Sequence, residues 1–253
     1  MPARNATYLE ASVLYAQATE LHDADGARVP YRRLSDVDRP TTYRDLALVL
    51  YGEAGLGHGL ALEGDLAFKR VSVEEPAALF SNSAPADLRL RLKRALRSGG
   101  WLVLAASADA KVPLGYDATE YPALGSGEPD FALQAHAGAG LGAGWVQAEL
   151  GARHRGGPAS DEWPFALQGG FRPAAAWTVV ADVRGHGRLG GRGGATSAEF
   201  DPALASSSVV MAGPGVTFAP TRNLSLGFQA WRSLAGRNMP AGWKWKLALA
   251  RVR

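Results

Sequence analysis

The sequence predicts an all-β fold, a transmembrane antiparallel up-and-down β-barrel of twelve strands, with residues 1–253 as a single domain. Three observations predict it. Segments of about 10 to 14 residues alternate apolar and polar side chains, which is the pattern of a strand with two different faces. The connections between these segments alternate long and short, and six tryptophans stand beside them. An even number of antiparallel strands with these features is typical of an outer-membrane barrel.

The clearest element is a hairpin at residues 87–112. Its first strand alternates leucines with charged side chains over Asp87–Lys93, and Ser98–Gly100 supplies small residues for a tight turn. Trp101 and a second alternating strand follow. Because an unpaired buried charge costs several kcal/mol, the charged face cannot enter a dry core. It meets either bulk water or a wet lumen.

The chain before this hairpin contains three further strands, each alternating leucine or valine with polar residues. They are predicted at Thr7–Leu21, Tyr43–Ala54 and Leu60–Val73. Two long polar connections, 22–42 and 74–86, and a glycine turn at 55–59 separate them from one another and from the hairpin. Asp, Gly and Pro make the long connections too irregular for a strand.

The chain after the hairpin contains seven strands with the same alternation. They are predicted at Asp130–Gly140, Gly144–Arg155, Glu162–Arg172, Trp177–Leu189, Ser206–Ala219, Leu224–Leu234 and Trp243–Val252. Long connections are expected at 114–129, 156–161, 190–205 and 235–242, and short turns at 141–144, 173–176 and 220–223. The long loops should lie at one end of the barrel, with the short turns and both termini at the other.

The tryptophans fit two interfacial belts, where an amphipathic ring is favoured. Trp101, Trp145 and Trp177 follow short turns, and Trp163, Trp231 and Trp243 lie beside long loops. We predict these six as membrane-interface aromatics.

Composition excludes several other classes. No apolar run approaches the roughly 18 to 20 residues of a membrane-spanning helix. A formal net charge of +3 is too small to indicate nucleic-acid binding, and the absence of cysteine suits an oxidising periplasm. No signal peptide is visible at residues 1–10, so an exported protein would already have lost it. A soluble barrel is the alternative, but twelve strands with the apolar face inward would leave a void.

Residues 111–173 resemble an outer-membrane family of transporters linked to phenol meta-cleavage pathways and distantly similar to fatty-acid and toluene channels. The resemblance is carried by Lys111–Gly115, by Tyr121-Pro122 and by Gly125–Asp130, within a looser similarity over 44–190. It implies passage of hydrophobic or aromatic solutes. About six residues precede the first strand, so the plug of the larger fatty-acid channels is not carried over to this chain.

Catalytic chemistry finds little support. His136 and His186 fall on the lumen side, but no carboxylate pair or second ligand stands with them at a recognisable spacing. His154 falls on the lipid side without a serine on the next strand, as a membrane lipase would need. The glycine-rich stretch 190–194 has no following helix for phosphate binding. We therefore predict no enzyme, no cofactor and no metal site.

What remains is a pore, and the alternation predicts its lining. The predicted pore-lining residues are Glu63, Asp65, Arg89, Arg91, Lys93, Asp109, Lys111, Glu149, Arg153, Asp182, Arg184, His186, Lys244 and Lys246. With Arg155 and Arg188 added, the excess is positive and favours anions. A weakly acidic aromatic or fatty acid would suit both this lining and the resemblance.

The sequence thus predicts an outer-membrane channel for passive diffusion of small solutes. The expected partners are outer-membrane lipid and small-molecule solutes, without nucleic acid. The alternative is a non-conducting structural barrel, or a partner subunit of a complex with other envelope proteins.

Overall fold

The computed structural model describes residues 6–31, 41–157, 159–190 and 206–253, and the regular secondary structure in these ranges is β-strand. The strands are β1 (Thr7–His22), β2 (Arg28–Pro30), β3 (Thr42–Gly57), β4 (Leu60–Glu74), β5 (Leu79–Gly99), β6 (Leu102–Pro113), β7 (Asp130–Leu141), β8 (Gly144–Arg155), β9 (Asp161–Ala174), β10 (Trp177–Leu189), β11 (Ser208–Phe218), β12 (Leu224–Arg237) and β13 (Met239–Val252). Among the described residues, no helix is long and apolar enough to cross a membrane.

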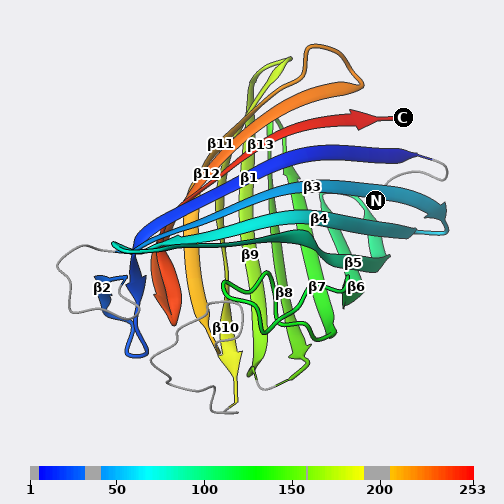
Figure 1. Ribbon diagram of the computed structural model, residues 1–253. Helices are drawn as coiled ribbons and strands as arrows, with labels where there is room; N and C mark the ends of the chain where they lie inside the picture. The colour runs from blue at the N-terminus through cyan, green and yellow to red at the C-terminus, as the bar shows by residue number, and fades with distance from the viewer. Residues whose placement is uncertain (1–5, 32–40, 158, 191–205) are drawn as a thin grey trace.

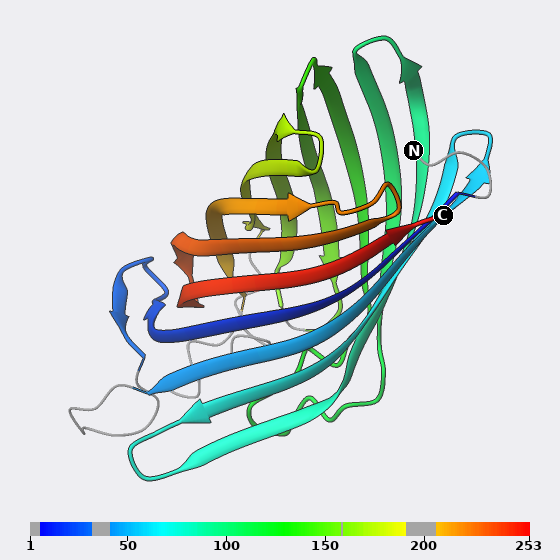
Figure 2. The same cartoon turned by 90° about the horizontal axis from the view of Figure 1, so that it is seen from above.

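The strands form one antiparallel sheet that closes on itself. Each long strand pairs with its neighbours in the chain, and β13 also pairs with β1 from Tyr8↔Val252 to His22↔Met239. Figures 1 and 2 both show β1, in blue, beside β13, in red. The short β2 pairs with β1 alone, as part of a hairpin outside the wall. The predicted barrel of twelve antiparallel strands is therefore confirmed.

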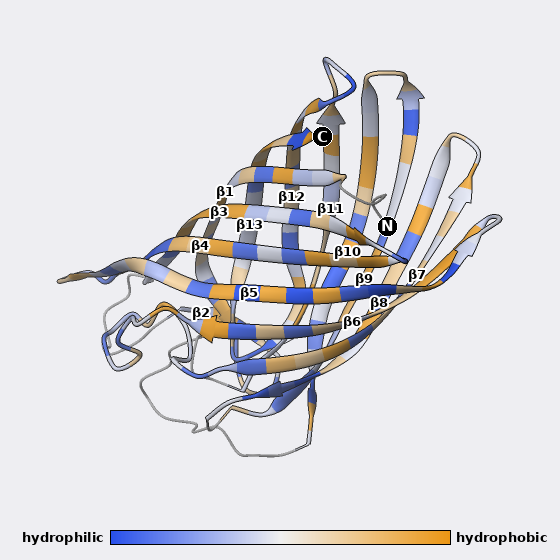
Figure 3. Cartoon of the chain, turned by 90° about the vertical axis from the view of Figure 1, so that its right-hand side faces the viewer, coloured by the Kyte–Doolittle hydropathy of each residue, from blue (hydrophilic) through white to orange (hydrophobic). Residues whose placement is uncertain are grey.

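The two faces of the wall differ as the alternation predicts. Leu46, Leu48 and Leu50 of β3 are 44%, 49% and 54% exposed on the outer face, whereas Ala47 between them is buried. Figure 3 shows the same alternation of hydrophobic and hydrophilic bands along neighbouring strands. Closure leaves no free edge in the wall, and it satisfies the backbone groups that lipid cannot solvate.

Two predicted connections are wrong. Most of 74–86 is strand, because β5 begins at Leu79 and pairs with β4 from Glu74↔Leu79 to Phe68↔Pro85, where the register then shifts. Connection 235–242 is also mostly strand, and β12 meets β13 at Asn238, which has a positive φ of 51°. A β-bulge near Phe68 and a one-residue turn at Asn238 allow these small and polar residues to remain in strands. The predicted alternation of long and short connections therefore fails at these two places.

Most of the other connections fall close to prediction, but residues 28–30 of the predicted connection 22–42 form β2, and its residues 32–40 lie outside the described residues. Short turns join β3 to β4, β5 to β6, β7 to β8 and β9 to β10, and Gly99 and Gly100 occupy their turn at φ 156° and 69°. Thr7 and Arg253 exchange backbone hydrogen bonds of 3.0 and 2.8 Å at the turn end of the barrel. The predicted loop 190–205 lies, apart from residue 190, outside the described residues.

Two of the six predicted interface tryptophans point inward instead. Trp231 is 3% exposed, and its indole nitrogen donates to Asp182 Oδ1 at 2.6 Å. Trp145 lines internal cavities beside Gln147 and lies over Gly170 of the next strand. Both share the strand parity of neighbouring polar side chains, so the side-chain alternation, rather than proximity to a turn, decides their direction.

The other four tryptophans are exposed. Trp101, in the turn between β5 and β6, is 68% exposed. The exposed fractions of Trp163, Trp177 and Trp243 are 40%, 45% and 42%. Trp243 stacks on Trp245, which stacks in turn on Tyr15 with ring centroids 5.7 Å apart. For these four positions the interfacial belt stays a prediction.

Candidate functional site

The candidate site is the inner face of the barrel. All fourteen residues predicted to line a pore lie around internal cavities between the strands. Their placement follows from strand parity, because successive side chains point to opposite faces of the wall. Their role in conduction stays a proposal, but the structure shows which of these charges are paired.

Arg91 is the centre of a first ion-pair cluster. Its guanidinium donates to both carboxylate oxygens of Asp109 at 2.9 Å and to Glu63 at 3.2 Å. Lys93 pairs with the other oxygen of Glu63. The register sets Glu63, Arg91 and Asp109 side by side on β4, β5 and β6. Bidentate pairs of this kind have a fixed geometry, so Arg91 and Lys93 are largely neutralised.

Lys111 belongs to a second cluster nearer the long-loop end. Its ammonium lies 3.0 Å from Asp130 and 3.9 Å from Asp87, and it donates to Ser126 Oγ at 2.9 Å. Lys111, Asp130 and Asp87 come from β6, β7 and β5. This lysine therefore ties three strands to the connection between β6 and β7.

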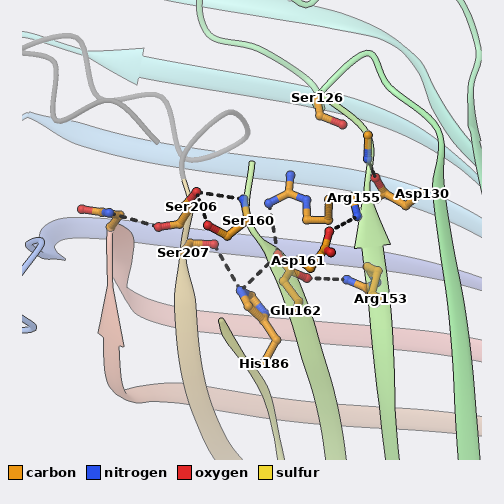
Figure 4. A network of polar contacts seen from close by, with 12 residues as sticks. Ser126, Asp130, Arg153, Arg155, Ser160, Asp161, Glu162, His186, Ser206 and Ser207 are labelled. Carbon is orange, nitrogen blue, oxygen red and sulfur yellow. Dashed lines mark hydrogen bonds and ion pairs between the residues drawn. The ribbon is translucent and has the colours of Figure 1, made fainter. Parts of the chain in front are cut away.

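Glu162 is the centre of a third cluster, shown in Figure 4. Its two carboxylate oxygens accept from Arg155 and Arg153, both at 3.0 Å, and its side chain is 4% exposed. His186 lies 3.8 Å from Glu162 and shares a 3.1 Å hydrogen bond with Ser207. One buried carboxylate thus compensates two guanidinium groups.

Asp182 holds a fourth group on β10. Arg184 pairs with it at 2.6 and 2.8 Å, and the same guanidinium lies 4.8 Å from the centre of the Trp231 ring. Asp182 also accepts from Gln168 at 3.1 Å. The carboxylate is therefore saturated by donors from three strands.

Ser107, His136 and Glu149 form a chain across β6, β7 and β8. Ser107 Oγ lies 3.0 Å from His136 Nε2, and His136 Nδ1 lies 3.6 Å from Glu149. The serine is 5% exposed and also donates to Asp109 at 3.1 Å. Both its hydrogen bonds are thus made within the wall, as expected for polar lining. No group of three or more potential ligands that could hold a metal ion occurs among the described residues.

A different arrangement occupies the wall of β13, β1, β3, β4 and β5. Here Lys246 pairs with Glu10 at 2.5 Å and Lys69 with Asp45 at 3.3 Å. Arg89 and Lys244 form no ion pair with any described residue. All of these groups surround one cavity of about 510 Å³.

The connection between β6 and β7 folds inward at the long-loop end. Leu124 is 1% exposed and packs with Tyr116 against Val71, an inward-facing residue of β4. Lys69 Nζ donates to Leu124 O at 3.1 Å, and Tyr116 donates to Asp87 at 2.8 Å. Burial raises the pKa of the Tyr116 hydroxyl, which therefore stays protonated as a donor. Residues 114–129 thus narrow the mouth of the barrel.

Sequence reasoning missed the carboxylates that neutralise the lining. The inner-face partners absent from the predicted set are Glu10, Asp45, Asp87, Asp130 and Glu162. Period-two parity alone would have placed each of them inside. They reduce the predicted excess of positive charge. Among the fourteen predicted lining residues, the cations without an ion pair to a described residue are Arg89 and Lys244, and both line the same cavity.

These features define a class, a closed barrel with an apolar outer face and a charged inner face. No family model matches the chain, and no curated protein matches it. Among solved structures, an outer membrane channel from Pseudomonas putida F1 aligns with a TM-score of 0.80 at 19% identity, covering 100% of this chain and 97% of that chain.

More distant structures share the architecture. The KdgM porin aligns with a TM-score of 0.54 at 6% identity, over 95% of this chain and 98% of that one. The translocator domain of the autotransporter NalP from Neisseria meningitidis aligns at 0.56 and 11%, over 98% and 88%. The chain therefore has the fold of outer-membrane β-barrels, a fold that channels and porins share.

Proposed function

We propose that this protein is an outer-membrane channel through which small solutes diffuse passively. One observation carries the proposal: a closed barrel turns its leucines outward and its ionisable side chains toward internal cavities. Lipid favours the first face and water the second, so the molecule suits a membrane with a polar passage. The fold shared with an outer membrane channel supports this function.

The proposed solutes are small, weakly acidic aromatic or hydrophobic compounds. Two independent features support this class. The unpaired cations Arg89 and Lys244 favour an anionic group, and the resemblance of residues 111–173 to transporters of phenol meta-cleavage pathways favours an aromatic one.

Conductance in a planar bilayer tests the proposal. The purified protein should give discrete single-channel steps, with a reversal potential in a KCl gradient that indicates mild anion preference. The preference should fall at high salt, since the screening length shortens from about 10 Å at 0.1 M to about 3 Å at 1 M. A folded, heat-modifiable protein without any conductance would contradict the proposal.

A second candidate is a non-conducting barrel that serves as a structural or partner subunit of an envelope complex. The inward fold of residues 114–129 favours it, because Leu124 and Pro122 are fully buried where a pore would open. A variant lacking residues 117–125 distinguishes the two. Under the channel proposal its conductance rises from a measurable basal value, whereas a subunit barrel conducts only after the deletion.

A further inference from the structure

The inner wall of β1, β3 and β4 carries an apolar patch within an otherwise charged lumen. The register places Leu14 beside Ala47 and Val49 beside Ala67, and all four line the cavity of about 510 Å³. This volume lies within the range of roughly 300 to 1,000 Å³ that small-molecule sites occupy. Apolar side chains in a wet passage attract the apolar part of a solute because both leave water.

The rim of this patch carries two cations, Lys244 and Arg89, that form no ion pair with any described residue. Lys244 of β13 is set beside Ala16 of β1, and Arg89 of β5 lies at the opposite side of the cavity. Arg89 is exposed to the lumen. One carboxylate, that of Asp45, and three positive charges, those of Lys69, Arg184 and Arg89, act on Lys244. The ammonium of Lys244 therefore sits in a positive field that an anion would relieve.

The carboxylates of the rim are mostly occupied. Glu10 accepts from Tyr8 at 2.8 Å and pairs with Lys246, and Asp45 pairs with Lys69. Asp87 accepts from Tyr116 and lies 3.9 Å from Lys111. Asp65, which the register sets opposite Arg89, is then the one rim carboxylate without an ion pair among the described residues. Two rim cations and one rim carboxylate are thus outside any ion pair among the described residues, while the cavity lining as a whole carries four cations and four carboxylates.

We infer that this patch is a binding site for small carboxylates with an apolar ring or chain. The ring lies on Leu14, Ala47, Val49 and Ala67, and the carboxylate is directed at the rim cations Lys244 and Arg89. Tyr8 and Tyr51, with ring centroids 5.8 Å apart, add an aromatic edge to the same cavity. The inference deepens the proposed channel function and rests on it for its physiological meaning, since a solute that diffuses through would pause here.

Three probes separate the parts of the site. Benzoate carries both ring and charge, benzyl alcohol the ring without the charge, and acetate the charge with almost no apolar surface. Calorimetric titration of the detergent-solubilised protein should show benzoate binding at least about tenfold more tightly than either, because charge-assisted bonds and apolar burial each contribute.

Single substitutions locate the site. Lys244→Gln and Arg89→Gln should each weaken benzoate binding about tenfold, the effect of one charge-assisted bond. Val49→Asn should weaken benzoate binding and leave acetate unchanged. Arg172→Gln, which removes an arginine from a different internal cavity, is the matched control and should leave benzoate binding unchanged. Heat-modifiable migration in a gel shows whether each variant is folded. If one of the three site variants does not fold, the other two still test the inference.

The outcomes are distinct. Equal affinity for benzoate and acetate, or unchanged benzoate affinity in all three site variants, overturns the inference. Bilayer conductance is measured on the same preparations. Conductance without benzoate binding overturns the site and leaves the channel proposal standing, whereas benzoate binding without conductance supports the site and overturns the channel proposal.

Discussion

The two halves of the inner wall differ in how far their cations are paired with carboxylates. From Arg91 of β5 to β10, most cations are paired with carboxylates: Arg91 with Asp109, and both Arg153 and Arg155 with Glu162. From β13 through β1 to Arg89 of β5, the wall has an apolar floor, and Lys244 and Arg89 at its rim have no ion-pair partner among the described residues.

This difference distinguishes charges that stabilise the barrel from charges that can interact with a solute. A saturated pair presents little net field, and its loss leaves a buried charge uncompensated. An unpaired cation contributes little to cohesion but acts on any anion in the lumen. Substitutions in the first half should therefore change stability, and substitutions in the second half should change selectivity.

The largest effect is expected at Glu162. Glu162→Gln removes the one carboxylate that Arg153 and Arg155 share, and the free energy of unfolding should fall by about 3–5 kcal/mol. Chemical unfolding of the protein in lipid vesicles measures this free energy. Glu74→Gln breaks an exposed ion pair in which the side chains of Glu74 and Arg44 are 53% and 36% exposed. This substitution should lower the free energy of unfolding by less than about 1 kcal/mol. Equal losses in the two variants would contradict a structural role for the Glu162 cluster.

The inward segment 114–129 should control conductance. Leu124→Asp places a charge at a position that is 1% exposed, which should expel the segment and raise single-channel conductance severalfold. Leu114→Asp, at a position 40% exposed in the same segment, is the control and should leave the conductance nearly unchanged. If neither substitution changes the current, the pathway does not pass this segment.

Arg89 and Arg91 offer a direct contrast on one strand. Arg89→Gln removes an unpaired cation, and the reversal potential should shift toward cations at low salt with little change in stability. Arg91→Gln breaks the pairs with Asp109 and Glu63, so stability should fall more than in Arg89→Gln. Reversal potentials and unfolding midpoints are measured for both variants. If both variants show the same changes in selectivity and stability, the distinction between paired and unpaired lining charges is wrong.

The smallest effect concerns alkaline pH. Burial raises the pKa of Tyr116 above its ordinary value of 10.0, and its bond to Asp87 adds to the rise. A raised folded-state pKa gives a stabilisation that is complete below pH 10 and is lost as the pH climbs toward the folded-state value. Unfolding free energies between pH 9 and 11 should fall by less than about 1 kcal/mol more in the native chain than in Tyr116→Phe. Parallel pH curves for the two proteins would exclude this contribution.

The hairpin at 87–112 shows what sequence could predict. Its alternation over Leu88–Lys93 is strong, its turn glycines are adjacent, and the charged side chains of this stretch line internal cavities. Trp231 marks the first limit: its position near a connection suggested an interface, while the parity set by Phe228 and Leu234 placed it inside.

The ion pairs mark the second limit. A partner on the next strand depends on register, and the register shifts by a residue between Ala95 and Arg97 and again near Phe68. Those bulges have no clear signal in the sequence, so which carboxylate neutralises Arg91 could not be predicted. The inward path of 114–129 depends on distant residues such as Val71, which no local pattern reveals.

The β1–β13 seam has a consequence for assembly. Its pairs join the two ends of the described chain, so they are the contacts of greatest sequence separation and the slowest to find each other. Until β13 arrives, β1 and the last strand in place each present an unpaired backbone edge that another chain could extend. Successful biogenesis therefore depends on shielding two nascent edges at once, and a substitution that delays the last strand would favour intermolecular pairing even where the finished barrel tolerates it.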